Sequence, residues 1–293
     1  MPSPLPELRG AYQGPRPSAS VVILTLNERA NIDACLASCT WSDDVHVLDS
    51  GSTDGTCQRA QELGAKVWHN PFAGFGAQRN WAIDNIPLKH DWVFHLDADE
   101  RFTMPLVQEM DQAIRAATPH SGFYVPNQMI LLGQWIKRSS GYPAYQVRFF
   151  HKGRLRFTDS GHGQREATTG TLDKLTTPYV HHNFSKGLAE WLERHNRYST
   201  KEAQQIIEEL SQPLGLGTML RGLLGGGMQR RRTLKRLFAR MPMRSTIRFC
   251  FALIVQGGIL DGRAGLAYAR LLAIYEQMIA VKVREGRQGR RSD

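Results

Sequence analysis

Short apolar segments that end in acidic or polar residues set the strongest limit on how this chain can fold. Residues 20–25 form a continuous apolar run, which is typical of a strand buried on both faces of a sheet. Three later segments are also predicted strands, at 45–49, 66–69 and 92–96. Helices are predicted between the strands, at 30–39, 56–63 and 74–86. This alternation predicts an α/β fold with a doubly wound, mostly parallel sheet.

Polar side chains gather where these strands end. Thr25, Asn27 and Glu28 close or follow the first strand, and Asp49 ends the second. Asp97 and Asp99 follow the fourth. Doubly wound sheets bind ligands in the crevice outside the carboxyl ends of their strands. We therefore expect one site that draws on all three strand ends.

The pair Asp97 and Asp99 suits a divalent cation. Two carboxylates one residue apart, placed after an apolar strand, can share Mg²⁺ or Mn²⁺, which prefer oxygen ligands. Such a cation can bridge a diphosphate and neutralise charge on a departing nucleotide. The alternative is a solvated turn or a helix N-cap, and the position after a strand favours the metal.

The segment from Asp49 to Thr56 allows two roles. Its Ser, Thr, Asp and Gly residues favour a turn with a helix cap, for which Thr53 and Asp54 are candidates. Asp49 can also accept hydrogen bonds from a base or a ribose. The two roles are compatible if Asp49 faces the crevice.

Four motifs occur in order along the chain, at residues 20–28, 47–56, 74–80 and 96–100. Together they resemble the family 2 glycosyltransferases of GT-A fold, and within them the bacterial lipopolysaccharide-core and polysaccharide enzymes. The resemblance continues through four further segments, at 133–136, 145–150, 195–199 and 258–265. It therefore covers nearly all of the chain after residue 20.

The resemblance implies an inverting hexosyltransferase that uses a nucleotide sugar, most often UDP-linked, with Mg²⁺ or Mn²⁺. Thr25, Asn27 and Glu28 would line the base and ribose, and Asp49 would bind the base. Arg79 would lie near the nucleotide or its diphosphate. Asp97 and Asp99 would form the DxD pair, with Asp99 as the direct metal ligand.

Inversion by direct displacement needs a general base for the acceptor hydroxyl. That base stands across the sugar from the diphosphate, so we expect it in the second half of the chain. Our first candidate is Glu166, followed by Asp159 and His162. Related lipopolysaccharide enzymes commonly carry an adjacent His-Glu pair, whereas here residues 163–165 separate His162 from Glu166. His162 has two alternatives, a contact to the diphosphate or metal and a purely structural role.

The formal net charge of +10 is confined to the last third of the chain. Residues 1–200 carry 20 basic and 20 acidic side chains, whereas residues 201–293 carry 17 and 7. Arg232, Lys235, Arg236 and Arg240 flank apolar residues at helical spacing, namely Leu234, Leu237, Phe238 and Met241. Basic amphipathic helices bind anionic membrane surfaces. The alternatives are a solvated helix packed on the body, and nucleic-acid binding, which the shortage of stacking aromatics disfavours.

These observations predict three regions. A disordered lead-in without a signal peptide covers 1–19, and a GT-A catalytic domain covers 20–210, with 20–104 for donor and metal and 105–210 for the acceptor. A helical, basic, membrane-associating region covers 211–293, in which the longest apolar stretch, 249–260, is too short to span a bilayer. Four cysteines without disulfide spacing fit a reducing compartment. We expect a cytoplasmic enzyme, peripheral on the inner face of the bacterial cytoplasmic membrane.

The predicted reaction moves a sugar from a nucleotide donor to a lipid-linked, lipopolysaccharide or exopolysaccharide acceptor. A nucleotidyltransferase of similar architecture is one alternative, but it needs a glycine-rich phosphate loop that residues 25–28 do not provide. A non-catalytic nucleotide-sugar or glycan-binding membrane protein is the other. Such a protein needs neither the DxD pair nor a base, so their presence favours an enzyme.

Overall fold

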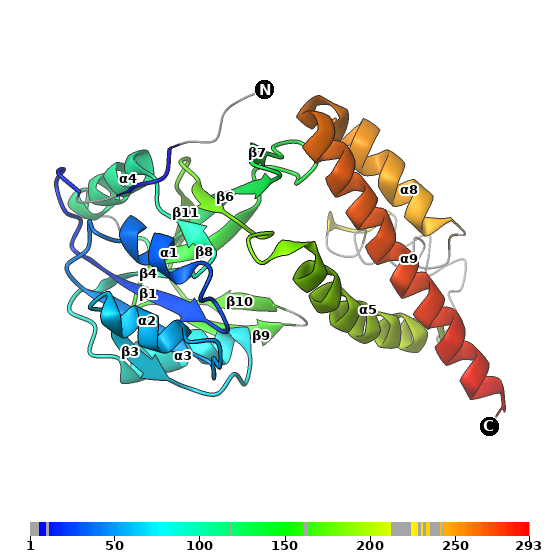
Figure 1. Cartoon of the computed structure of the whole chain (residues 1–293), viewed down its shortest axis with the longest axis horizontal. Helices are drawn as coiled ribbons and strands as arrows, with labels where there is room; N and C mark the ends of the chain where they lie inside the picture. Colours follow the sequence, from blue (N-terminus) through cyan, green and yellow to red (C-terminus); the bar gives the residue numbers. More distant parts are fainter. Residues whose placement is uncertain are drawn as a thin grey trace. The chain divides into compact units, whose positions relative to one another are not determined.

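The computed structural model describes the chain in two compact units, Met1–Lys186 and Gly187–Asp293 (Figure 1). The described residues are 6–9, 12–117, 119–160, 163–211, 224–227, 230, 233–234, 241 and 243–292.

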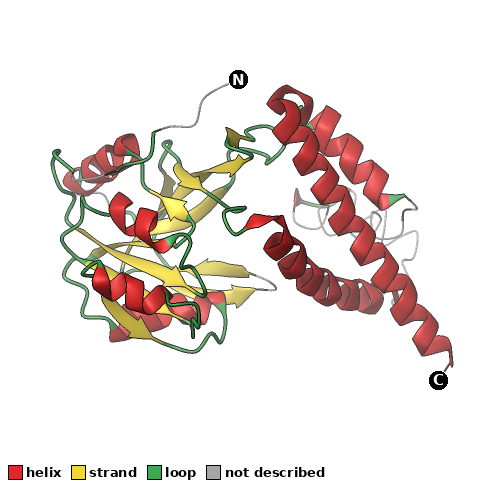
Figure 2. Ribbon diagram, viewed as in Figure 1, coloured by secondary structure: helices red, strands yellow, loops and turns green. Residues whose placement is uncertain are grey.

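The first unit contains a main sheet, a separate two-stranded sheet of β9 and β10, and four helices within the described residues (Figure 2). Its strands are β1 (Ala19–Thr25), β2 (Val45–Asp49), β3 (Lys66–His69), β4 (Trp92–Asp97), β5 (Glu100–Arg101), β6 (Gly122–Leu131), β7 (Gln134–Trp135), β8 (Tyr145–His151), β9 (Arg156–Ser160), β10 (Gly163–Ala167), β11 (Leu172–Lys174) and β12 (Tyr179–His181). Its helices are α1 (Ile32–Ser38), α2 (Thr56–Glu62), α3 (Phe75–Asn85) and α4 (Met104–Arg115). The four strands and three helices expected in residues 20–96 are confirmed.

The main sheet joins a parallel half to a mixed half. Its strand order is β3-β2-β1-β4-β8-β6-β12-β5, with β7 and β11 paired to β6. Strands β3, β2, β1 and β4 run parallel to one another. Strand β8 runs antiparallel to both of its neighbours, β4 and β6. The α/β class is confirmed, and β8 is the strand that connects the two halves.

Strand β1 is apolar throughout because both of its faces are covered. Val21 and Ile23 belong to one core with residues of α1, α2 and α4. Val22 belongs to a second core with Ala82 and Ile86, at the carboxyl end of α3. Side chains alternate between the faces of a strand, so a strand between two helical layers needs apolar residues at every position.

The N-terminal segment differs from the expected disordered lead-in. Leu8 and Tyr12 are buried in the first core, and the Leu8 N–H donates a hydrogen bond to the carbonyl of Phe102 at 2.9 Å. His182 Nε2 lies 2.6 Å from Glu7 Oε1. This part of the lead-in therefore packs on the first unit.

The second unit is helical in its described residues. It contains α5 (Gly187–Ser211), α8 (Arg244–Cys250), the π-helical turn η1 (Phe251–Val255), the 3₁₀ turn η2 (Gly258–Asp261) and α9 (Gly262–Ser292). The helix expected at 187–210 is confirmed. The basic amphipathic helix expected around residues 232–241 lies mostly outside the described residues.

Helix α5 packs along α9, which explains why the unit boundary follows Lys186 and not residue 210. Ile206 of α5 shares a small core with Ile279 and Val283 of α9. Lys282 Nζ donates to Asn196 Oδ1 at 2.6 Å. The segment 195–199, which contributed to the family resemblance, thus forms part of a joint between two helices.

Among the described residues, no single helix is long and apolar enough to cross a membrane. Residues Arg244–Val255 and Gly258–Gln288 meet the requirements of length and apolar composition only as a pair, and this pair is bent by 73°.

Gly265 is required by close packing at the start of α9. A Cβ at this position would lie 2.0 Å from the Gly258 carbonyl oxygen and 2.7 Å from Asp261 Cβ. Because backbone must move to make room, we expect Gly265→Ala to lower the free energy of unfolding of this unit by about 1–3 kcal/mol. Hydrogen exchange of peptides from α5 and α9 measures the local loss.

Gly286→Ala is the matched control within the same helix. Its Cβ would meet only the tip of the flexible Ile207 side chain, at 2.6 Å from Cδ1. The gain in helix propensity of about 1 kcal/mol opposes that contact. Equal exchange protection in the two variants would contradict the role assigned to Gly265.

Candidate functional site

The strand register brings the predicted residues to one edge of the sheet. Thr25 at the end of β1 lies opposite Asp49 of β2, and Leu24 lies opposite Asp97 of β4. His69, at the end of β3, lies on the other side of Asp49. The expectation that three strand ends converge is therefore confirmed in the geometry.

Asp49 organises the turn that follows β2. Its carboxylate accepts hydrogen bonds from Thr25 Oγ1 at 3.0 Å and from the backbone N–H groups of Gly51 and Ser52 at 2.8 Å. Burial would raise the pKa of Asp49, but the hydrogen bonds from Ser52, Gly51 and Thr25 lower it below its usual value. Asp49 is 1% exposed, so its carboxylate stabilises the turn from the buried side.

The loops after β1 and β2 are tied directly to each other. Asn27 has a left-handed backbone (φ 55°), its N–H donates to Ser52 Oγ at 2.8 Å, and its side-chain oxygen accepts from the Thr53 N–H at 2.8 Å. The Glu28 N–H donates to Thr56 Oγ1 at 2.8 Å. Thr25, Asn27 and Asp49, expected to line the nucleotide, thus form the framework of these loops.

Asp54 lies one residue before Gly55, the N-cap residue of α2, which differs from the cap expected at Thr53 or Asp54. Its carboxylate accepts from the Thr56 N–H and from the Arg29 N–H, both at 3.0 Å. It therefore joins the helix to the loop after β1.

A buried cluster of opposite charges surrounds the end of β4. Arg148 of β8 donates from Nη2 to Asp97 Oδ2 at 2.7 Å and to Glu100 Oε1 at 2.6 Å. Arg79 of α3 lies 3.4 Å from the other oxygen of Asp97 and donates to Gln164 Oε1 at 2.6 Å. Arg79, Arg148 and Glu100 are each at most 3% exposed, whereas the Asp97 side chain is 38% exposed. Arg79 therefore lies beneath the site and supports Asp97.

The charges in this cluster shift one another's ionisation. Burial would raise the pKa of Asp97, but Arg148 and Arg79 hold it well below its usual value. Burial raises the pKa of Glu100 to about 7, against the attraction of Arg148. Burial and the neighbouring Arg148 together lower the pKa of Arg79 to about 10. Asp97 is therefore an anion whose charge is already largely balanced by two guanidiniums.

Asp99 lies at the same edge with a different partner. Its Oδ2 is 3.3 Å from Nε2 of His181, at the end of β12. Burial would lower the pKa of His181, but Asp99 raises it to about 9. The negative charge of Asp99 also acts on Glu28, whose pKa burial raises despite hydrogen bonds from Lys186 and Asn31. Asp99 and His181 therefore form an acid–imidazole pair, and Glu28 is near enough to feel the charge of Asp99.

Asp99 and His181 offer ligand types that suit a divalent cation. Carboxylates and a neutral imidazole are ligands of Mn²⁺, and carboxylates of Mg²⁺, and a cation would replace the proton that His181 shares with Asp99. Asp97 is less available because two arginines contact it. Asp99 and His181 are therefore the residues that could hold the metal, and His181 was missed because its segment follows β4 by more than eighty residues.

A second set of possible ligands, Asp49, Cys57 and His69, is less suited to a metal. Their ligand atoms lie within 4.8 Å of one another. However, Asp49 is already engaged by several donors, and burial and Asp49 raise the pKa of the Cys57 thiol to about 11. A protonated thiol is a poor metal ligand.

The three candidates for the general base are not brought together. Glu166 is half-buried on β10, and its charge acts on Tyr124 of β6. Among the described residues, the Glu166 side chain has no hydrogen-bond or ion-pair partner. His162 lies outside the described residues.

Asp159, the third candidate, sits at the N-terminus of α3. Its Oδ1 accepts the Gly76 N–H at 2.8 Å. A Cβ at Gly74 would lie 2.4 Å from Asp159 Oδ2, and one at Gly76 would lie 2.9 Å from the Thr158 backbone carbon. The two glycines therefore let the carboxylate and β9 approach the helix end, where a negative charge is stabilising.

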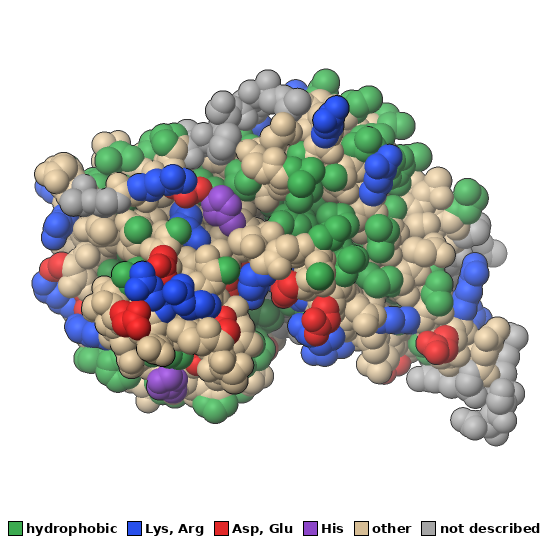
Figure 3. All heavy atoms as spheres, viewed as in Figure 1, with side chains coloured by type: hydrophobic (Ala, Val, Ile, Leu, Met, Phe, Trp, Pro, Cys, Tyr) green, Lys and Arg blue, Asp and Glu red, His purple; other side chains and the backbone are tan. Residues whose placement is uncertain are grey.

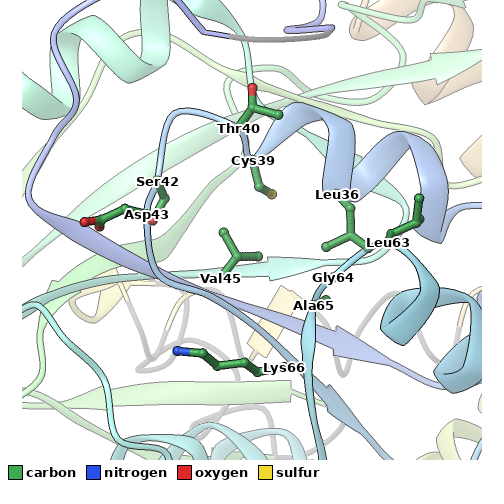
Figure 4. Close-up of a pocket in the computed structure, with 10 residues that line it drawn as sticks. All are labelled: Leu36, Cys39, Thr40, Ser42, Asp43, Val45, Leu63, Gly64, Ala65 and Lys66. Carbon is green, nitrogen blue, oxygen red and sulfur yellow. The ribbon is translucent and has the colours of Figure 1, made fainter.

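A cavity of about 270 Å³ lies at the opposite end of the strands (Figure 4). It is lined by Val45 and Lys66, the first residues of β2 and β3, together with Leu36, Asp43 and Leu63. None of the predicted site residues lines it. The carboxyl edge therefore remains the candidate site.

Comparison with known proteins identifies the family. The model named glycosyl transferase family 2 matches residues 20–166, just over half of the chain. The chain belongs to glycosyl transferase family 2. Its mixed sheet, with ligand loops at the carboxyl edge of a parallel half, is the GT-A fold expected from the sequence.

Two curated relatives illustrate how far the similarity extends. Lipopolysaccharide core biosynthesis glycosyltransferase LpsC of Rhizobium meliloti is 26% identical over 206 residues, which cover 68% of this chain and 75% of that protein. An uncharacterized glycosyltransferase of Rickettsia bellii is 36% identical over 114 residues, 39% of this chain and 37% of that protein. The shorter match thus spans well under half of either protein.

Two solved structures are similar at low identity. Staphylococcus aureus TarS, residues 1–349, is 15% identical with a TM-score of 0.39, and the match covers 93% of this chain and 92% of that one. Glucosyl-3-phosphoglycerate synthase of Mycobacterium tuberculosis, in complex with Mn²⁺ and UDP-glucose, is 24% identical with a TM-score of 0.31. That match covers 43% of this chain and 52% of the other.

Asp159 gives a test that separates capping from catalysis. Asp159→Asn keeps an oxygen acceptor for the Gly76 N–H, whereas Asp159→Ala removes it. We expect the alanine variant to lose about 0.5–2 kcal/mol of stability, and the asparagine variant to lose less. Urea denaturation, with sugar transfer measured in parallel, reads out both properties. A folded Asp159→Asn protein without transfer activity would instead identify Asp159 as the base.

Proposed function

We propose that this family 2 glycosyltransferase is an inverting, metal-dependent hexosyltransferase. It transfers a sugar from a nucleotide donor, which we propose is UDP-linked, to a lipid-linked or lipopolysaccharide-type acceptor. The observation that carries this proposal is the contact between Asp99 and His181, at the sheet edge where the loops after β1 and β2 are tied together. The lipopolysaccharide acceptor rests on the similarity to LpsC.

The donor would lie along the carboxyl edge of the parallel strands. The loops after β1 and β2 already hydrogen-bond to each other, so binding the nucleoside would need little loop ordering. A divalent cation on Asp99 and His181 would supply positive charge to the diphosphate. Asp97, held by Arg148 and Arg79, would accept hydrogen bonds from the ribose or sugar.

The acceptor hydroxyl would lose its proton to Glu166. This carboxylate belongs to β10, whose Gln164 contacts Arg79, so it lies on an element that reaches the same cluster. It is half-buried and, in the described part of the chain, free of hydrogen-bond partners, as a base awaiting a substrate should be.

We also propose that the protein works at the cytoplasmic face of the bacterial inner membrane. The excess of basic residues after position 200 supports this location, since anionic lipids attract such segments. A lipid-linked acceptor would be found at the same surface.

The metal role predicts the behaviour of Asp99→Asn. We expect transfer to fall by about a hundredfold or more, because loss of the cation removes several kcal/mol of charge stabilisation. Thermal shift with Mn²⁺ and a panel of UDP-sugars should show ligand stabilisation for the wild type and not for the variant. Asp91→Asn, an exposed aspartate at the start of β4, is the control. Full activity of Asp99→Asn, or of wild type with a chelator, would refute the metal role.

The base role predicts a different kinetic pattern for Glu166→Gln. We expect kcat to fall by about 10²–10⁴ while the donor KM changes little, since the side chain acts only on the acceptor proton. Steady-state kinetics with UDP-sugar and lipopolysaccharide-containing membranes measures both constants. Glu62→Gln, an exposed glutamate of α2, should behave as wild type. A normal kcat for Glu166→Gln would move the base to another residue.

A further inference from the structure

Helix α8 and the turn η1 present an apolar stripe to the outside of the second unit. Its members recur at helical spacing, and they are Met243, Thr246, Ile247, Cys250, Phe251, Ile254 and Val255. Ile254 and Val255 are 69% and 70% exposed. The same seven residues line one continuous surface groove.

The side of α8 that faces α9 makes two polar contacts, next to the buried Ala252 of η1. Arg244 is 7% exposed, and its Nη2 donates to Glu276 Oε2 of α9 at 2.7 Å. Ser245 Oγ donates to Gln277 Oε1 of α9 at 3.1 Å. A helix at the surface of a protein in water normally places its apolar side inward. Here a charged side chain is buried while the apolar stripe is exposed, so the stripe is suited to an apolar environment.

The bend after η1 extends this surface. Gly257 has a left-handed backbone (φ 75°), and the chain turns there into η2. Ile259 and Leu260 follow, 65% and 58% exposed. Residues 249–260 contain no charged side chain. The stripe and the bend are together called the apolar tip.

Basic residues border the apolar tip. The Arg248 guanidinium lies 6.0 Å from the Phe251 ring centre, and Arg263 and Arg270 are exposed along α9. The acidic residues nearest in the chain add little negative charge to this surface, because Asp261 is 5% exposed and Glu276 forms an ion pair with Arg244. In the view of Figure 3, hydrophobic side chains gather over the helical unit with Lys and Arg side chains among them. An apolar surface bordered by cations matches the boundary between acyl chains and anionic headgroups.

We infer that the apolar tip inserts into the interface of an anionic bilayer, with Arg248 and Arg263 at the level of the phosphates. Insertion stops at the tip because the exposed arginines of α9 are costly in hydrocarbon. A symmetric contact between two copies of the chain would bring these arginines against each other. Their repulsion disfavours a second copy as the partner of the apolar tip. The inference rests on the proposed membrane location and is independent of the transfer reaction.

Vesicle sedimentation of the full chain tests the insertion. We expect wild type to bind vesicles of phosphatidylethanolamine and phosphatidylglycerol more strongly than vesicles of phosphatidylcholine. The double variant Ile254→Glu, Val255→Glu should bind the anionic vesicles at least about tenfold more weakly. Leu132→Glu is the matched control, because Leu132 is 70% exposed in the first unit. It should bind as wild type.

A fluorophore on Cys250 tests depth without adding a charge. Cys250 is exposed in the stripe, Cys35 and Cys39 are buried, and Cys57→Ala removes the remaining half-buried thiol. We expect an environment-sensitive label on Cys250 to shift to the blue with anionic vesicles and to be quenched by brominated lipids. The same label on Leu132→Cys, in a chain with Cys250→Ser, should not respond.

The outcomes separate the two proposals. If wild type binds neither kind of vesicle, the membrane location itself fails. If wild type binds but the double variant binds equally and the label does not shift, the location stands and insertion of the tip is refuted. If light scattering finds a wild-type dimer that the double variant dissociates, with vesicle binding unchanged, the tip is instead an interface between copies.

Discussion

The buried contact of Arg148 with Asp97 and Glu100 is the interaction on which the rest of the first unit depends. Removing one member of such a buried ion pair lowers the free energy of unfolding by about 3–5 kcal/mol, because it leaves the other charge without compensation. Arg148 comes from β8, which is antiparallel to β4 and connects the two halves of the sheet. The pairing therefore fixes that joint. It also fixes Asp97 at the edge, so that Asp99, two residues on, projects where His181 can meet it.

A second constraint acts on the loops. Asp49 ties together the turn after β2, and Asn27 ties that turn to the loop after β1. Asn27 adopts φ 55°, which asparagine tolerates better than most residues, so its conformation and its hydrogen bonds agree. Asn27 and Asp49, which the resemblance predicts to line the nucleotide, thus support the loops through these hydrogen bonds. A ligand at this edge would meet loops whose backbone donors are already oriented, which lowers the ordering cost of binding.

Much of the first unit could be predicted from local pattern, and the rest depends on contacts that pattern does not contain. The strands at 20–25, 45–49 and 92–96 and their shared edge follow from apolar runs with polar ends. The partners of Arg148 and of Asp99 do not, because each pair joins residues more than forty positions apart. The role of Asp159 also depends on a contact that the local pattern does not contain. Its residue type fits a general base, but the fold brings its carboxylate to the N–H of Gly76, which is 83 residues away in the chain.

The second unit shows why periodicity alone is insufficient. Residues 243–255 have an apolar stripe at helical spacing, which ordinarily predicts a face packed on a core. The decisive observation is the burial of Arg244 against Glu276, which turns the helix so that its stripe faces out. A short apolar segment that cannot span a bilayer can still contact one, since interfacial binding depends on the exposed area and the neighbouring cations and not on length. The carboxylates of the first unit, proposed for the chemistry, and the apolar tip of the second, proposed for the location, are therefore separate features that substitutions can test independently.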